Sequence, residues 1–127
     1  MTGITNKDGP VAVTGASGYI GSRVVEDLLD QGYEVHACVR DASNGKKVDH
    51  LIELGKKANN CDVHLFEGDL FEKGSYDKAF SGCAAVIHAG ATVGFNRETP
   101  QEVYDGCFTE NEHVVQSVKK SGSVKRF

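Results

Sequence analysis

The sequence lacks tryptophan, has one methionine and two prolines, and contains no long hydrophobic run among its 127 residues. A helix that crosses a membrane needs roughly 20 predominantly apolar residues, and no segment approaches that length. The first ten residues also lack the apolar core of a secretory signal. We therefore expect a cytoplasmic protein without a membrane partner.

An excess of positive charge is absent as well. The chain has 14 basic and 18 acidic residues, for a net charge of -4. Proteins that coat nucleic acid need a basic face, so we do not expect nucleic acid as a partner. The 39% hydrophobic and 25% charged content is typical of a globular protein. The length suits one domain and is too short for two.

The cysteines lack the spacing of a metal or redox site. Cys38, Cys61, Cys83 and Cys107 form no C-x-x-C pair, whereas a zinc site or a redox dithiol usually has two ligands within one turn. We expect reduced and mostly buried thiols, and no metal site.

Glycine is abundant, with 15 residues, about 12% against a usual ~7%. The chain has no low-complexity tract, so the glycines serve particular backbone positions. Short β-rich runs alternate with helical patterns between them. We expect strands at 11–14, 34–39, 63–66 and 84–88, and the opening of a fifth at 124–127.

The helical patterns complete the fold prediction. The first helix has apolar residues on one face, at Ile20, Val24, Val25, Leu28 and Leu29. We expect a second helix ending near Gly55, a short one over 74–80, and a long one from Thr99 to Gly122, opened by a Thr-Pro-Gln-Glu capping box. The long helix has its apolar residues at Val103, Phe108, Val114, Val115 and Val118. Strands that alternate with crossover helices indicate an α/β fold, a doubly wound parallel sheet that is incomplete after the start of its fifth strand.

The first turn contains a G-x-x-G-x-x-G motif between a strand and a helix, the context of a dinucleotide-binding Rossmann-type sheet. Gly15 permits the tight turn, Gly18 lets the backbone approach a pyrophosphate, and Gly21 lets the helix pack near the strand. We assign Ser17, Tyr19 and Ile20 of the same turn to the cofactor site. A plain tight turn would also use glycine.

The second strand ends in Arg40, at the place where an NAD-binding protein usually has an acidic residue for the ribose. A guanidinium can hold a 2′-phosphate, and Lys47 could add a second positive charge, so we expect NADP rather than NAD. Solvated surface charges are the alternative for both residues. Asp41 keeps NAD open, because it could accept from the ribose.

The third and fourth strands end in further candidates. Asp69 could accept from the adenine amino group, with Leu70 beside it, although a turn-capping role for Asp69 is equally open. The small residues Ala89, Gly90 and Ala91 would let the backbone approach the nicotinamide end, and we expect a structural role for His88. Phe95 and Asn96 are candidates for substrate contact, with a plain loop role equally open.

These motifs, in the order T-G-A-S-G-Y-I-G, V-R-D, G-D-L and V-I-H-A-G-A, resemble the extended short-chain dehydrogenase/reductase superfamily, of the NAD-dependent epimerase/dehydratase type. The stretch 39–51 is similar to the dihydroflavonol reductase and cinnamoyl-CoA reductase group, over a resemblance that extends from about 11 to 127. The resemblance implies that Arg40 and Lys47 bind the 2′-phosphate of NADPH and that Asp69 binds adenine. It also implies that 1–127 is the N-terminal part of an NAD(P)-binding domain.

The chain departs from this group at several positions. Ala42 stands where the group usually has proline, 91–95 replaces its Thr-Pro segment, and His113 replaces an asparagine that helps order the active-site region. The family's Tyr-x-x-x-Lys pair, in which the tyrosine is a general acid, is absent. The residues four positions after the four tyrosines are Arg23, Ala37, Phe80 and Phe108.

We therefore assign no catalytic residue. We expect the cofactor-binding part of an NADP-dependent reductase that transfers hydride between NADPH and a small-molecule carbonyl, present as a fragment that is inactive alone. Two alternatives stay open: an NAD-dependent nucleotide-sugar epimerase or dehydratase, and a non-catalytic dinucleotide-binding module. A homodimer formed through the long helix is open as well, because that helix could instead pack only on the sheet.

Overall fold

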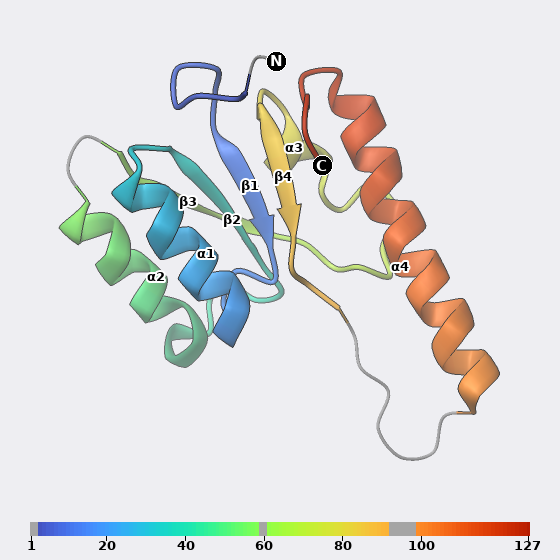
Figure 1. Cartoon of the computed structure of the whole chain (residues 1–127). Coiled ribbons are helices and arrows are strands. Elements are labelled where there is room, and N and C mark those ends of the chain that lie inside the picture. Colours follow the sequence, from blue (N-terminus) through green and yellow to red (C-terminus); the bar gives the residue numbers. More distant parts are fainter. Residues whose placement is uncertain (1–2, 59–60, 92–98) are drawn as a thin grey trace.

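The computed structural model describes residues 3–58, 61–91 and 99–127, and its strands form one parallel sheet (Figure 1). The strands are β1 (Val11–Thr14), β2 (Val35–Val39), β3 (Val63–Glu67) and β4 (Ala85–His88). Their order is β3-β2-β1-β4. The chain therefore moves outward from β1 to β3 and then returns to the other side of β1. This confirms the predicted doubly wound α/β sheet, and it places the switch point between β1 and β4.

The helices cover both faces of the sheet (Figure 1). One face carries α1 (Tyr19–Asp30) and α2 (Gly45–Lys57), and the other carries α3 (Asp77–Phe80) and α4 (Pro100–Ser121). Alternate strand residues enter two separate cores. Val11 and Val13 pack with α1 and α2, whereas Ala12 between them packs with α3 and α4. Both faces of β1 are buried, and its first three residues form a continuous apolar run.

Two details of α1 and α2 differ from the prediction. Ile20 is 69% exposed, because the packed face of α1 uses Val25, Leu28 and Leu29 and the first turn lies off the core. Gly55 does not end α2, which continues to Lys57. A Cβ atom on Gly55 would lie 3.0 Å from the Asp62 Oδ1 atom, so this glycine permits close packing of α2 instead of stopping it.

The helices on the other face also differ in part. α3 begins at Asp77, because Gly74 adopts a φ of 78° in the preceding turn. The predicted capping box of α4 is present: the Thr99 side chain accepts from the Glu102 N–H, and the Glu102 side chain accepts from the Thr99 N–H. Phe108 is 61% exposed, whereas the buried face of α4 consists of Glu110, Val114 and Ser117.

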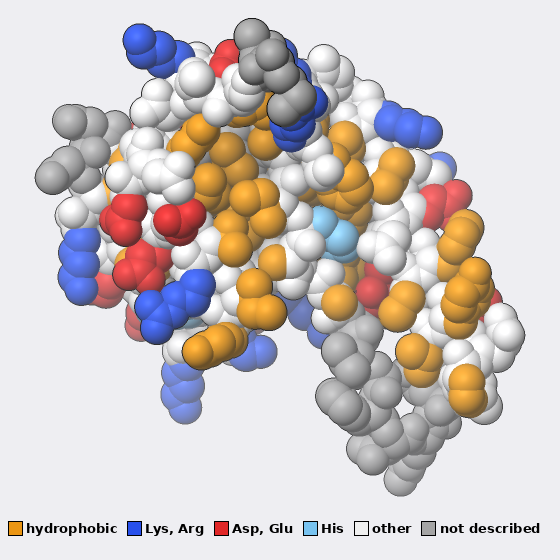
Figure 2. Space-filling model, in the orientation of Figure 1, with side chains coloured by type: hydrophobic (Ala, Val, Ile, Leu, Met, Phe, Trp, Pro, Cys, Tyr) orange, Lys and Arg blue, Asp and Glu red, His pale blue; other side chains and the backbone are white. Residues whose placement is uncertain are grey.

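The last residues begin to pair beside β4. Arg126 forms a parallel bridge with Ala85, with a bond of 3.0 Å from the Val86 N–H to the Arg126 carbonyl. Ile87 and Phe127 remain exposed at this side of the sheet. Figure 2 shows hydrophobic side chains reaching the surface between α1 and α4.

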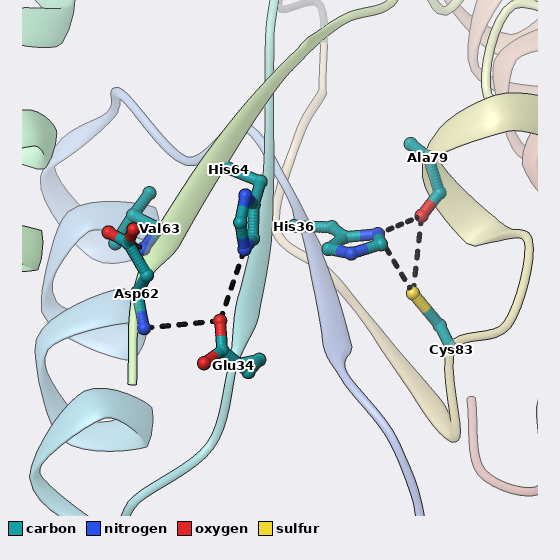
Figure 3. Close-up of polar contacts among 7 residues, drawn as sticks. All are labelled: Glu34, His36, Asp62, Val63, His64, Ala79 and Cys83. Atoms are coloured by element: carbon teal, nitrogen blue, oxygen red, sulfur yellow. Dashed lines mark hydrogen bonds and ion pairs between the residues drawn. The ribbon is translucent and has the colours of Figure 1, made fainter. Parts of the chain in front are cut away.

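Polar contacts tie α3 and β3 to β2 (Figure 3). The Ala79 carbonyl at α3 lies 2.7 Å from His36 Nδ1 and accepts from the Cys83 thiol at 3.2 Å. On the other side of His36, His64 Nε2 lies 3.1 Å from Glu34 Oε2. These contacts hold the edge strand and the short helix α3 against the centre of the sheet.

We expect Phe80→Ala to lower the free energy of unfolding by about 3–5 kcal/mol, because the Phe80 side chain is fully buried and its removal leaves a cavity. Phe108→Ala is the matched control, since that phenyl ring is mostly exposed, and we expect a change within about 0.5 kcal/mol. Urea unfolding of the two variants and the parent chain measures both effects. Equal losses would contradict the placement of α3 and α4.

The four cysteines are free thiols, and Cys38, Cys61 and Cys83 are buried while Cys107 is half-buried. Burial raises the pKa of Cys83 to about 12 and raises the pKa of Cys38 as well, so both remain protonated at neutral pH. We expect a colorimetric thiol reagent to modify Cys107 first in the native chain and all four thiols only in denaturant. Fast modification of a Cys107→Ser variant under native conditions would refute this order.

Candidate cofactor site at the carboxyl ends of the strands

A cavity of about 150 Å³ opens where the carboxyl ends of the strands meet. It is lined by residues that follow all four strands: Gly15, Arg40, Gly68, Asp69, Leu70, Tyr76, Gly90 and Ala91. Gly15, Arg40, Asp69, Leu70, Gly90 and Ala91 belong to the set that the sequence predicts. Parallel strands end at one edge of a sheet, so residues far apart in the sequence converge here.

The turn after β1 allows its backbone to touch the end of β4. Gly15 has a φ of 63°, and a Cβ atom there would lie 2.7 Å from the Gly90 Cα atom. A Cβ atom on Gly21 would overlap the Gly15 carbonyl, so the start of α1 packs directly on the turn. Gly15 and Gly90 thus leave bare backbone in the wall of the cavity.

The first turn of α1 has the features of an anion site. Gly18 is the N-cap residue, with no side-chain cap hydrogen bond and no acidic residue in the turn that follows. The N-terminal N–H groups of α1 are therefore not satisfied by a carboxylate of this turn, and the helix dipole adds positive potential. Ser17, Tyr19 and Ile20 belong to this segment but do not line the cavity, and the Tyr19 side chain is 84% exposed.

The turn after β2 separates the roles of its two charged residues. The Asp41 Oδ1 atom accepts from the Ser43 N–H at 2.9 Å and from the Ser43 hydroxyl at 2.6 Å. These bonds hold the pKa of Asp41 below its usual value, and Lys47 nearby lowers it further. Arg40 remains exposed at the cavity. Lys47 lies in the first turn of α2 and outside the cavity lining.

The loop after β3 is held by hydrogen bonds between its own residues and by one hydrogen bond from α4. The Asp69 N–H donates to the Ser75 hydroxyl at 2.8 Å, and the Phe71 N–H donates to Asp69 Oδ1 at 2.9 Å. His113 Nδ1 lies 2.8 Å from the Leu70 carbonyl, so it donates its proton there. The residue that departs from the family pattern therefore still anchors this loop to α4.

A hydrogen-bonded chain links β1, β4 and α4 behind the cavity. The buried Thr14 hydroxyl accepts from the N–H groups of Ala89 and Gly90, each at 3.1 Å. Its own proton is left for His88 Nδ1, 2.6 Å away. His88 Nε2 then donates to Asn111 Oδ1 at 3.0 Å. Both nitrogens of His88 are thus used, in one tautomer, to position the segment after β4, as the predicted structural role requires.

Sequence reasoning missed two of the lining residues. Gly68 precedes Asp69, and a Cβ atom there would overlap the Tyr76 ring. Tyr76 precedes α3 and is buried in the second core. The position of Gly68 directly before the candidate Asp69 is a weak sequence signal for Gly68. The sequence carries no signal for Tyr76. Phe95 and Asn96 lie outside the described residues.

Two absences hold for the part of the chain that the structure describes. No group of three or more His, Cys, Asp and Glu side chains is arranged to hold a metal ion there. None of its helices has the length and apolarity to cross a membrane.

Comparisons with known proteins extend these observations. Dihydroflavonol 4-reductase of Solanum lycopersicum is 42% identical over 117 residues, covering 91% of this chain and 30% of that protein. A cinnamoyl-CoA reductase of Medicago truncatula is 41% identical over 124 residues, covering 96% of this chain and 37% of its own length. The chain therefore spans about a third of these relatives.

A similar solved structure is the NADPH complex of Gre2 from Candida albicans, at a TM-score of 0.73 and 27% identity, covering 91% of this chain and 34% of that one. The model of one family, described as the NAD dependent epimerase/dehydratase family, matches residues 11–127. The glycine turn, the strand order and this match over almost the whole chain show that the protein belongs to the NAD-dependent epimerase/dehydratase family.

Proposed function

We propose that this chain is the NADP(H)-binding part of a reductase that acts on a small-molecule carbonyl. The observation that carries the proposal is the turn after β2, where Asp41 is bonded to Ser43 while Arg40 is exposed at the cavity. An NAD site would need an acidic side chain turned toward the ribose. A guanidinium with a lysine nearby instead suits the 2′-phosphate of NADP.

The residues present fit a dinucleotide. The contact of Gly15 with Gly90 forms a cradle that a side chain would fill, and the start of α1 offers N–H groups for a pyrophosphate. In this arrangement Arg40 and Lys47 hold the 2′-phosphate, and Asp69 accepts from the adenine amino group. The backbone of 89–91 borders the nicotinamide end. When bound, the cofactor supplies the hydride that reduces a carbonyl carbon.

The relatives support the class of reaction. Two of them are named as reductases of dihydroflavonols and of cinnamoyl-CoA, and a structural neighbour was solved with NADPH. We therefore propose a carbonyl of similar aromatic chemistry as the substrate class of the enzyme in which this chain works.

We expect the 127-residue chain to bind NADPH more tightly than NADH. Arg40→Ala should weaken NADPH binding about tenfold, the low end of the ~1.5–3 kcal/mol for a hydrogen bond to a charged group, and leave NADH binding within about twofold. Lys47→Ala should act in the same direction. Lys57→Ala at the other end of α2 is the matched control and should change neither affinity.

Isothermal titration calorimetry measures these affinities, and circular dichroism checks that each variant is folded. A preference for NADH that is unchanged in Arg40→Ala would reject NADP as the cofactor. Failure of the folded chain to bind either dinucleotide would reject the proposed function as a whole.

We also expect the chain to bind NADPH without turning it over. It has no tyrosine followed four residues later by lysine, and general acid catalysis contributes about 10²–10⁴-fold to such a step. NADPH absorbance with a dihydroflavonol present should fall no faster than in buffer. Carbonyl-dependent oxidation by the purified chain would contradict this expectation.

A further inference from the structure

Tyr76 combines a buried ring with a place in the wall of the candidate cofactor cavity. The residue is 4% exposed, yet it lines that cavity together with Arg40 and Asp69. Both charged residues are also close enough to Tyr76 to influence its ionisation. The phenol therefore lies in the wall of the cavity that Arg40 and Asp69 also line.

The ring of Tyr76 is held rigidly. It stacks on Phe80 with ring centroids 5.4 Å apart and planes inclined by 18°. On another side the Gly68 backbone approaches so closely that any Cβ atom would overlap the ring. These contacts hold the ring in place and so fix the position of the phenol oxygen.

The Tyr76 hydroxyl has no hydrogen-bond partner among the described residues. A hydroxyl that is fully enclosed by protein and lacks a hydrogen-bond partner would lower the stability of the fold. In the described ranges, however, only Ser123 has a side-chain oxygen that is both fully enclosed and without a partner. The phenol oxygen thus keeps access to solvent at the cavity. Burial raises the pKa of Tyr76, so the hydroxyl stays protonated and can donate.

Asp69 lines the same cavity and offers a hydrogen-bond acceptor. Asp69 Oδ1 accepts from Phe71, while Oδ2 is used by no hydrogen bond within residues 3–58, 61–91 and 99–127. A hydroxyl donor and an available acceptor therefore line the same cavity, with Leu70 and Ala91 as apolar walls. The edge of adenine presents the complementary pair, an amino donor beside a ring-nitrogen acceptor.

We propose that the Tyr76 hydroxyl recognises the adenine of the cofactor by donating a hydrogen bond to a ring nitrogen while Asp69 accepts from the amino group. This inference rests on the proposed function, and it adds a cofactor-binding residue that sequence motifs do not mark. It assigns to Tyr76 part of the selectivity for adenine over other bases.

The test uses Tyr76→Phe, which keeps the ring and its stacking on Phe80 and removes only the hydroxyl. The probe is adenosine 2′,5′-bisphosphate, which carries the adenine end of NADP without the nicotinamide. We expect affinity for this probe and for NADPH to fall by the same factor, about three- to tenfold, the range of one neutral hydrogen bond. Isothermal titration calorimetry measures both.

Two tyrosines serve as matched controls. Tyr33→Phe removes a hydroxyl that donates to the Ile4 carbonyl at 2.9 Å, so it should lower the melting temperature without changing affinity. Tyr104→Phe removes an exposed hydroxyl and should change neither. The chain has four tyrosines and no tryptophan, so its intrinsic fluorescence reports tyrosine. Binding of the probe should alter this emission less in Tyr76→Phe than in the parent chain.

The outcomes separate the two proposals. If the parent chain binds the probe and folded Tyr76→Phe binds it equally well, the role of Tyr76 is refuted and the proposed function stands. If Tyr76→Phe weakens NADPH binding but not binding of the probe, the contact to adenine is refuted. If the folded parent chain binds neither the probe nor NADPH, both proposals fail.

Discussion

The approach of the Gly15 backbone to the Gly90 backbone is the constraint on which the rest of the site depends. It brings the turn after β1 against the end of β4, and a side chain at either position would push them apart. The Thr14 hydroxyl fixes the contact by accepting from two successive N–H groups after β4. Because β1 and β4 adjoin at the switch point of the sheet, this contact also forms part of the wall of the cavity.

Local polar contacts then shape the other walls. Ser43 holds Asp41 in the turn after β2, Ser75 holds the backbone of Asp69 after β3, and His113 reaches across from α4 to Leu70. Each contact fixes a loop before any ligand arrives. A site built this way loses less conformational freedom on binding, so more of its contact energy remains as affinity.

Much of this arrangement could be predicted from the sequence, because its signals are local. Apolar runs and helical periods marked every strand and helix, and the capping box at Thr99 formed as predicted. Two of the errors share a cause, which is that the packing partner of a residue lies far away in the chain. Gly55 was predicted to stop α2, and it instead makes room for Asp62. Phe108 was predicted to pack, but the face of α4 that meets the sheet excludes it.

By itself the sequence determined the fold class, the strand ends and the loop residues that converge there. Glycine turns, hydrophobic periods and charged residues can be recognised from residues that are close together in the sequence. Only the tertiary structure decided which of those residues share a cavity. Six of the predicted residues line it, and the other seven do not: Ser17, Gly18, Tyr19, Ile20, Gly21, Lys47 and Ala89. Tyr76 also lines the cavity, although no local sequence pattern marks it. Its position depends on how α3 packs against β2 and on the space that Gly68 leaves beside the ring.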